Sequence, residues 1–112
     1  MQRSAPEGIK DMASSKEYAD FILDQYSGLS ARAMMGEYVL YYGGKVVGGV
    51  YDNRLLVKST TSAKALMPDA EYQLPYEGAK EMLLVEAVED RAFLEKLFTA
   101  MYDELPEPKK RR

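Results

Sequence analysis

The apolar residues near the start of the chain recur every three or four positions, which is the spacing of an amphipathic helix. They are Tyr18, Phe21, Ile22 and Tyr26, with Leu29 just beyond. Ser14 and Glu17 have the S-x-x-E spacing of a capping box at a helix start. Gly28 suits the left-handed position that ends a helix. The pattern therefore predicts a helix from about residue 15 to residue 27, with one apolar stripe.

Residues 37–59, EYVLYYGGKVVGGVYDNRLLVKS, change to a strand-like pattern rich in aromatic and β-branched residues. The preceding stretch, residues 30–36, has no clear periodicity, and we interpret it as a linker. The strand-like pattern predicts three strands, at residues 38–42, 46–51 and 55–58.

Paired turn residues divide these strands. Gly43-Gly44 and Asp52-Asn53 predict two-residue hairpin turns, because both central positions of such turns adopt left-handed backbone angles. Gly48-Gly49 lies inside the middle strand, where glycine marks a bulge or a close approach of another backbone. The glycine pairs do not match a phosphate-binding loop, because neither GxxxxGK[ST] nor a GxGxxG that opens a helix is present.

The second half of the chain alternates short elements with turn residues. Thr60, Thr61 and Ser62 can cap a short helix that Pro68 ends. A last helix opens at Asp90 and carries a clear apolar stripe. The predicted elements are a helix at 62–67, a short edge strand at 71–74, a strand at 82–87 and a helix at 90–105.

The resulting order is α-β-β-β-α-β-β-α, in which strands are grouped rather than alternating with helices. Such grouping is typical of an α+β fold with a mostly antiparallel sheet, and we expect the helices to cover one face of that sheet. We predict a disordered leader at residues 1–13, a single domain at 14–105 and a basic tail at 106–112. A chain of 112 residues is long enough to bury a core without disulfides.

The composition argues against most enzyme classes. The chain contains no cysteine and no histidine, which removes Ser-His-Asp triads, Cys-His pairs and ordinary zinc sites. Enzymes that use only Asp, Glu, Lys or Tyr remain chemically open. Glu86, Glu89 and Asp90 cluster where a helix begins, and capping explains them. We therefore expect no catalytic, cofactor-binding or metal-binding residues.

The charge balance argues against nucleic-acid binding by the body of the chain. The chain has 15 basic and 18 acidic residues. Residues 106–112 hold four of the basic residues and one of the acidic ones, which leaves 11 and 17 in the rest. An acidic body matches a phosphate backbone poorly, so only the tail is expected to contact nucleic acid, weakly. No apolar run is long enough to span a bilayer, and we expect a cytoplasmic protein.

The tyrosines and methionines are the best candidates for binding a partner. Tyr38 and Tyr42 share one face of a strand and Tyr41 takes the other, because strand side chains alternate. One set can pack under the helices while the other anchors a protein partner, where tyrosine is favoured. Met34 and Met35 form a flexible apolar pair that suits either core packing or a soft binding surface.

The stretch RAMMGEYVLYYGGKVVGGVYDNRLLVK, residues 32–58, resembles the N-terminal domain of the TfoX/Sxy family, bacterial regulators of natural competence. In outline that domain reads R-x-M-F-G-x-x-G-x-Y, then a Gly-containing turn, an apolar strand and D-x-x-L-Y-x-K. The matching residues, in order, are Arg32, Met34, Gly36, Tyr41, Asp52, Leu55 and Lys58. The chain departs from the pattern at Met35, Val39 and Leu56, where Phe, Gly and an aromatic residue are usual. The looser resemblance covers about residues 14–105.

This resemblance implies an α+β fold like that of type III secretion chaperones, a tendency to form homodimers and no known catalytic activity. Longer members add a C-terminal helical domain and act with a transcriptional activator. The expectation for this chain is therefore a non-enzymatic interaction or regulatory module that binds a protein partner or a second copy of itself. The residues that we expect to form the contact are Arg32, Met35, Gly36, Tyr38, Tyr41 and Tyr42.

Two alternatives stay open. One is a small-ligand or nucleotide-binding domain with a pocket between the sheet and the first helix, near Gly48-Gly49. The other is a DNA-associated accessory protein that uses the basic tail.

Overall fold

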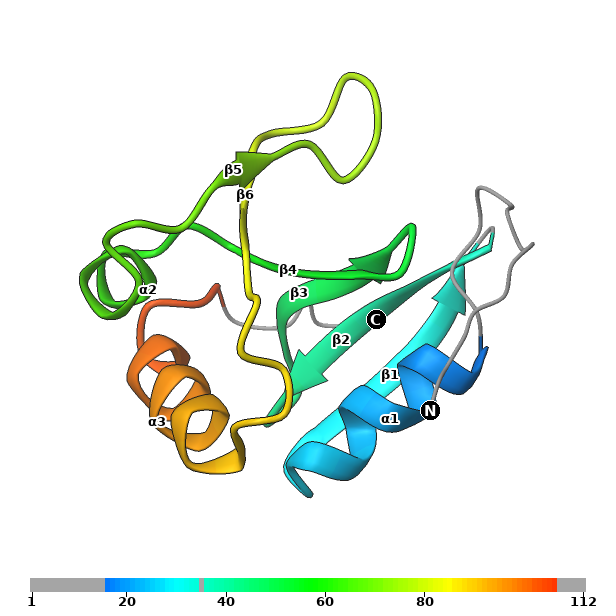
Figure 1. The fold of residues 1–112 in the computed structure, drawn as a ribbon, viewed down its shortest axis with the longest axis horizontal. Helices are drawn as coiled ribbons and strands as arrows, with labels where there is room; N and C mark the ends of the chain where they lie inside the picture. The colour runs from blue at the N-terminus through cyan, green and yellow to red at the C-terminus, as the bar shows by residue number, and fades with distance from the viewer. Residues whose placement is uncertain (1–15, 35, 107–112) are drawn as a thin grey trace, which may run out of the picture.

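The structure is a computed structural model, and it describes residues 16–34 and 36–106. Figure 1 shows these residues as an antiparallel sheet with three helices. The elements are α1 (Lys16–Gln25), β1 (Leu29–Met34), β2 (Glu37–Tyr42), β3 (Lys45–Tyr51), β4 (Arg54–Val57), α2 (Thr61–Leu66), β5 (Tyr72–Gln73), β6 (Met82–Leu84) and α3 (Arg91–Tyr102).

The six strands lie in the order β1-β2-β3-β4-β6-β5, and every neighbouring pair is antiparallel. The first four follow one another as a meander, and the β5–β6 hairpin then adds to the β4 edge through β6. This arrangement confirms the predicted α+β class and its antiparallel sheet. It also leaves β1 and β5 as the two edge strands.

The main core lies between one face of the sheet and the helices. The buried cluster joins Ile22 of α1 and Phe98 of α3 to Leu40, Val50 and strand residues further along the sheet. Figure 1 shows α1 running in front of β1, while α2 and α3 stand together near the other end. The apolar stripe of α3 is buried as its spacing predicts: Leu94, Leu97, Phe98 and Met101 are fully buried. This burial stabilises the fold by about 1.5–3 kcal/mol for each large side chain.

Both predicted hairpin turns are confirmed. Gly43 and Gly44 have φ angles of 59° and 85°, and Asp52 and Asn53 have 55° and 57°. These left-handed angles at both central positions match the twist of the flanking strands. The β3–β4 turn is reinforced by the Glu37 carboxylate, whose Oε1 accepts a hydrogen bond from the Asp52 amide at 3.1 Å.

The predicted irregularity at Gly48-Gly49 is also confirmed. Leu40 of β2 pairs with Gly48, whereas the next residue, Tyr41, pairs with Val46, so Val47 is the extra residue of a bulge. Val47 is fully buried. The bulge therefore bends β3 and adds one apolar side chain to the core.

The helix starts follow their capping residues. The Asp90 side chain accepts a hydrogen bond from the Phe93 amide at 3.0 Å, and Thr60 does the same for Ala63 at 3.1 Å. Asp90 therefore caps α3 as predicted. Glu86 and Glu89, the other two acidic residues of the cluster at this helix start, are exposed.

The predicted linker at residues 30–36 is wrong, because residues 29–34 form strand β1. Their sequence, LSARAM, pairs along its whole length with β2. Leu29 and Ala31 face the core, but the apolar side chains on that face are mostly small. The two faces of β1 therefore differ little in hydrophobicity, and the sequence pattern does not indicate a strand. Pairing with β2 stabilises the strand instead.

The first helix is shorter than predicted. It ends at Gln25, and the Leu29 amide donates to the Tyr26 carbonyl at 3.2 Å to close a turn into β1. Gly28 lies in this turn without a left-handed angle, so the predicted helix stop at Gly28 is also wrong. The predicted capping residue Ser14, the leader and the basic segment 107–112 lie outside the described residues.

Three later elements are shorter than predicted. The strand predicted at 71–74 is reduced to β5, the one predicted at 82–87 ends as β6 at Leu84, and α3 ends at Tyr102. Val85 and Leu105 nevertheless remain buried beyond these ends. Their burial explains why the apolar pattern runs past the regular structure.

Candidate functional site

Strand β1 is the most accessible part of the predicted contact region. It pairs only with β2, so its other side is a sheet edge. Ser30, Arg32, Ala33 and Met34 are all exposed, and 48% of the Met34 surface is accessible. An edge strand carries backbone groups that can pair with another chain. β1 therefore combines a pairing edge with an exposed apolar side chain.

The tyrosines of β2 divide between the two faces, as side-chain alternation predicts. Tyr38 and Tyr42 pair with Ala33 and Leu29 on the helix side, and both pack against the core. The Tyr42 ring lies 6.1 Å from that of Phe98, and its hydroxyl lies 3.2 Å from the Tyr26 hydroxyl. Tyr38 and Tyr42 therefore serve mainly in packing under the helices.

Tyr41 lies on the opposite face of the sheet. It stands across from Ser30, and Arg32 is one step further along the same face of β1. Diagonal neighbours of this kind are within reach of long and aromatic side chains. We call Arg32, Met34 and Tyr41 the β1–β2 patch. Arg32 is exposed and forms no ion pair with the residues that the structure describes.

The six predicted contact residues do not form one surface. Arg32 and Tyr41 belong to the β1–β2 patch, and Gly36 is exposed in the turn between β1 and β2, with a φ of 87°. Tyr38 and Tyr42 lie on the other face, and Met35 lies outside the described residues. Met34 was missing from the predicted set, although the methionine pair had pointed to this place. Recognising β1 as a strand would have shown that Met34 shares a face with Arg32.

A second surface feature lies on the same face of the sheet as Tyr41, further along. Loop 74–81 is the tip of the β5–β6 hairpin (Figure 1), and it lines a groove of about 480 Å³ together with residues of β3 and residues 58–60. We call it the loop groove. Tyr51 and Tyr76 contact each other across it with ring centroids 6.2 Å apart, and Lys58 and Lys80 contribute to its lining.

The loop groove is held in place by Arg54. Its Nε donates to the Tyr51 carbonyl at 2.9 Å, and its guanidinium also donates to Gln73 Oε1 at 2.6 Å and to the Leu74 carbonyl at 3.3 Å. These bonds tie the β3–β4 hairpin to the start of loop 74–81. Burial raises the pKa of the Tyr51 phenol, and the neighbouring Tyr76 and Glu37 raise it further.

Gly48 lines the loop groove, but the groove's other walls come from loop 74–81 and residues 58–60 rather than from α1. The groove that Gly48 lines is therefore on the face of the sheet opposite α1. On the helix side, the side chains of Val47 and Val50 are fully buried in the core.

Within residues 16–34 and 36–106, no three His, Cys, Asp or Glu side chains are grouped so that they can hold a metal ion. None of the three helices in this part of the chain is long and apolar enough to cross a membrane.

Comparison with known proteins identifies a relative over nearly the whole chain. No family model matches the sequence, and no solved structure matches it. The match is to a protein of Spirochaeta aurantia described as an uncharacterized 12.7 kDa protein in the trpE 5′ region. The two sequences are 37% identical over 106 residues, which is 90% of this chain and 91% of the relative. The chain therefore belongs to the same family as this Spirochaeta aurantia protein.

Proposed function

We propose that the chain is a non-enzymatic interaction module that binds a protein partner through strand β1 and the β1–β2 patch. The observation that supports this is the edge position of β1 together with its exposure. An extended segment of a partner, or a second copy of β1, can add to such an edge by backbone hydrogen bonds. Met34 and Tyr41 then supply apolar contact, and Arg32 supplies a charge that favours acidic partners.

The resemblance to the TfoX/Sxy N-terminal domain supports the same proposal. In that reading the module acts in transcription regulation by contacting another protein. The resemblance includes Arg32, Met34 and Tyr41, which together make up the β1–β2 patch.

Photo-crosslinking from the patch tests the proposal. Met34 is replaced by a benzoyl-phenylalanine residue in the full chain, and Leu74 is replaced in a control, because 48% of Met34 and 46% of Leu74 are exposed. We expect a crosslinked band from position 34 after irradiation in cells, absent from position 74 and lost on Arg32→Glu. A band at twice the mass identifies self-association. Identical patterns from positions 34 and 74 would contradict the proposal.

Tyr41→Ala provides a second test. Tyr41 is half-buried on the face away from the main core, so the variant should weaken the crosslink while the far-UV circular dichroism spectrum stays unchanged. If Tyr41→Ala unfolds the domain, then Tyr41 is a core residue and its assignment to the contact is wrong.

The loop groove supports a second candidate function, the binding of a small anionic ligand with an aromatic ring. Its volume falls within the usual range for small-molecule sites, roughly 300–1,000 Å³. Tyr51 and Tyr76 can stack on a ring. Lys58 and Lys80 stand against the single carboxylate of Glu81 in the lining, and the net positive charge favours an anion. Native mass spectrometry of the freshly purified protein tests this: a retained small molecule that Tyr76→Ala releases would favour it, and an adduct-free spectrum would remove it.

A further inference from the structure

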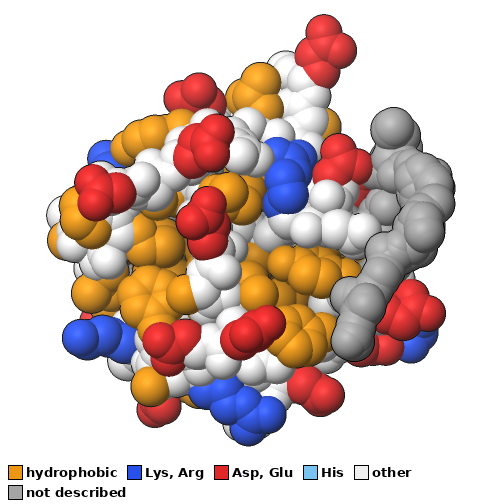
Figure 2. Space-filling view, in the orientation of Figure 1, with side chains coloured by type: hydrophobic (Ala, Val, Ile, Leu, Met, Phe, Trp, Pro, Cys, Tyr) orange, Lys and Arg blue, Asp and Glu red, His pale blue; other side chains and the backbone are white. Residues whose placement is uncertain are grey.

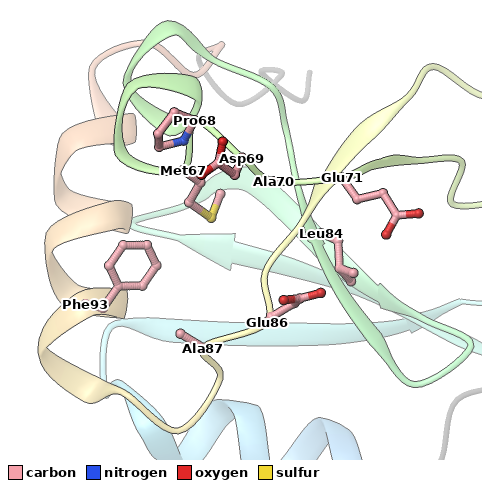
Figure 3. Close-up of a pocket in the computed structure, with 9 residues that line it drawn as sticks. All are labelled: Met67, Pro68, Asp69, Ala70, Glu71, Leu84, Glu86, Ala87 and Phe93. Atoms are coloured by element: carbon pink, nitrogen blue, oxygen red, sulfur yellow. The ribbon is translucent and has the colours of Figure 1, made fainter.

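A second groove, separate from the β1–β2 patch and from the loop groove, lies between α2, β6 and α3. Its walls are residues 67–71, which follow α2, and residues 84–87 at the end of β6, and Phe93 of α3 closes one end. The groove has a volume of about 360 Å³. Figure 3 shows the Phe93 ring and the Met67 thioether pointing into the space between these walls. We call it the acidic groove.

The floor of the acidic groove is apolar. Met67 and Phe93 are half-buried and pack against the main core from the outside. Leu84 is also half-buried, but it pairs with Leu56 and points to the other side of β6 from the core residue Leu83, so it lies at the margin of this floor. Their exposed parts remain in contact with water. Covering such surface contributes about 25 cal/mol for each Å² removed from water, so an apolar side chain seated here is favoured.

The rim of the acidic groove carries negative charge. Asp69 and Glu71 stand on one wall and Glu86 on the other, and all three are exposed. None of the three forms an ion pair with another residue in the described part of the chain, and the groove lining includes no lysine or arginine. Figure 2 shows Asp and Glu side chains around apolar ones on this face, over the region of α2, α3 and β6. The ligand must therefore combine an apolar group with positive charge.

The walls are fixed by backbone hydrogen bonds. The Leu84 amide donates to the Glu71 carbonyl at 2.9 Å, and the Ala70 amide donates to the Met67 carbonyl at 3.0 Å. These bonds hold both walls to the sheet and to the end of α2. A site that is formed before binding loses little conformational entropy when its ligand arrives.

The exposure of the rim favours a protein segment over a small molecule as the ligand of the acidic groove. Small-molecule sites cover most of their ligand's surface, about 70–90%. Here the residues on both walls, such as Asp69 and Glu86, are exposed, so a free amine would stay largely in water. A peptide can seat one or two apolar side chains on the floor while flanking lysines or arginines reach the carboxylates.

We propose that the acidic groove docks a basic, amphipathic segment of a partner protein, with an apolar side chain on Met67 and Phe93 and cationic side chains paired to Asp69, Glu71 and Glu86. This contact is independent of the strand-addition contact at β1, because it uses other elements and the opposite sign of charge. Charge complementarity supplies the specificity, since an acidic or neutral segment would leave the three carboxylates unpaired.

Fluorescence anisotropy with a defined probe tests this proposal. The probe is a labelled peptide that contains Lys-Lys-Leu-Phe-Lys-Lys, and the reference peptides contain Glu-Glu-Leu-Phe-Glu-Glu or Lys-Lys-Ser-Ser-Lys-Lys. Each is titrated with the full chain at low salt. We expect the first peptide to bind most tightly, because it alone has both the charge and the apolar anchor.

Charge reversal locates the contact. Glu71→Lys combined with Glu86→Lys should weaken binding of the basic apolar peptide about tenfold, because two attractive contacts become repulsive. The matched control combines Glu77→Lys with Glu95→Lys, which changes net charge equally at exposed positions outside the groove. That control should bind within about twofold of the wild type. Circular dichroism confirms that both double variants are folded.

Three results would overturn the proposal. The first is equal weakening by the groove variant and the control, which would mean nonspecific attraction to an acidic protein. The second is equal binding of the basic peptide with serines, which would mean that the floor is not used. The third is absence of peptide binding while benzylamine perturbs the amide resonances of residues 67–71, which would make the groove a small-amine site.

Discussion

Replacing Gly48 by alanine tests how tightly the bulge in β3 packs against β4. A Cβ atom at position 48 would press on the Leu56 carbonyl oxygen and lie 2.8 Å from the Val57 Cα atom. Both neighbours belong to the backbone of β4, which pairs with Gly48 through Val57. A side chain can rotate out of the way, but a strand must move as a whole. Gly48→Ala should therefore displace β4 or break its pairing with β3.

The size of the effect follows from the elements that β4 supports. Leu55 and Val57 of β4 are fully buried in the core, and β4 also carries β6 on its other side. Overpacking a well-formed core costs about 1–3 kcal/mol and occasionally more. We expect about 3 kcal/mol, because the obstacle is backbone on a central strand. A domain of this size typically has a total stability of about 5–15 kcal/mol.

Thermal and urea unfolding monitored by circular dichroism measure this loss. A loss of about 3 kcal/mol should lower the melting temperature by roughly 10–15 °C. Gly78→Ala is the control, because a Cβ atom there meets nothing within 4 Å, although the φ of 90° adds backbone strain of about 1–2 kcal/mol. If Gly48→Ala costs no more than Gly78→Ala, then β3 and β4 do not approach as closely as described.

Two further predictions concern charged side chains. Lys45 is 6% exposed, and its Nζ donates to the Tyr102 carbonyl at 3.2 Å and lies 4.0 Å from the centre of the Tyr102 ring. Lys45→Met should therefore lower the free energy of unfolding, measured with urea, by about 2 kcal/mol. The control Lys96→Met, on the exposed side of α3, should change it by less than about 0.5 kcal/mol. The Glu104 carboxylate accepts hydrogen bonds from the Ser62 side chain at 2.6 Å and the Ser62 amide at 3.0 Å, and these bonds lower its pKa. Because the folded pKa of Glu104 is depressed, the contact stabilises the fold above the unfolded pKa, and this stabilisation is lost as pH falls through the folded pKa. The urea midpoint should therefore fall less between pH 7 and pH 3 in Glu104→Gln than in the wild type. An equal fall in the two proteins would contradict this assignment.

The parts of the fold that were predictable are those that local chemistry dictates. Gly43-Gly44 and Asp52-Asn53 form turns because few other residue pairs accept two left-handed positions in succession. Asp90 caps α3 because its short side chain reaches the Phe93 amide directly. The apolar stripe of α3 was predictable because its side chains are large and the remaining positions of the helix are mostly polar.

Strand β1 was missed because its stability comes from a neighbour rather than from its own residues. Alanine and serine have little strand preference, and at an edge strand only one side is paired. The register that places Leu29 beside Tyr42 depends on which side chains of β1 are buried next to β2. The sequence of β1 alone does not reveal this. This error also hid Met34, the exposed residue that completes the β1–β2 patch.

The acidic groove could not be found from the sequence because its walls are distant along the chain. Residues 67–71 meet the end of β6 through the β5–β6 hairpin, and β6 joins the sheet beside β4 rather than beside a sequential neighbour. Phe93 is in the first turn of α3, and its half-buried position depends on how α3 packs against α2. Glu86 was explained by its closeness to a helix start, whereas its place in the structure is on the groove rim.

The sheet order separates the two proposed contacts. β1 is at one edge, and the acidic groove lies beyond β4, with β2 and β3 between them. The first contact offers the cation Arg32 and an open strand edge, and the second offers three carboxylates around an apolar floor. One partner segment cannot satisfy both, because the charge that suits one site is repelled at the other. Arg32→Glu should therefore leave the basic peptide's affinity for the acidic groove unchanged. Glu71→Lys with Glu86→Lys should leave the crosslink from position 34 intact. If a variant at one site changes binding at the other, the two sites are coupled and a single partner spans them.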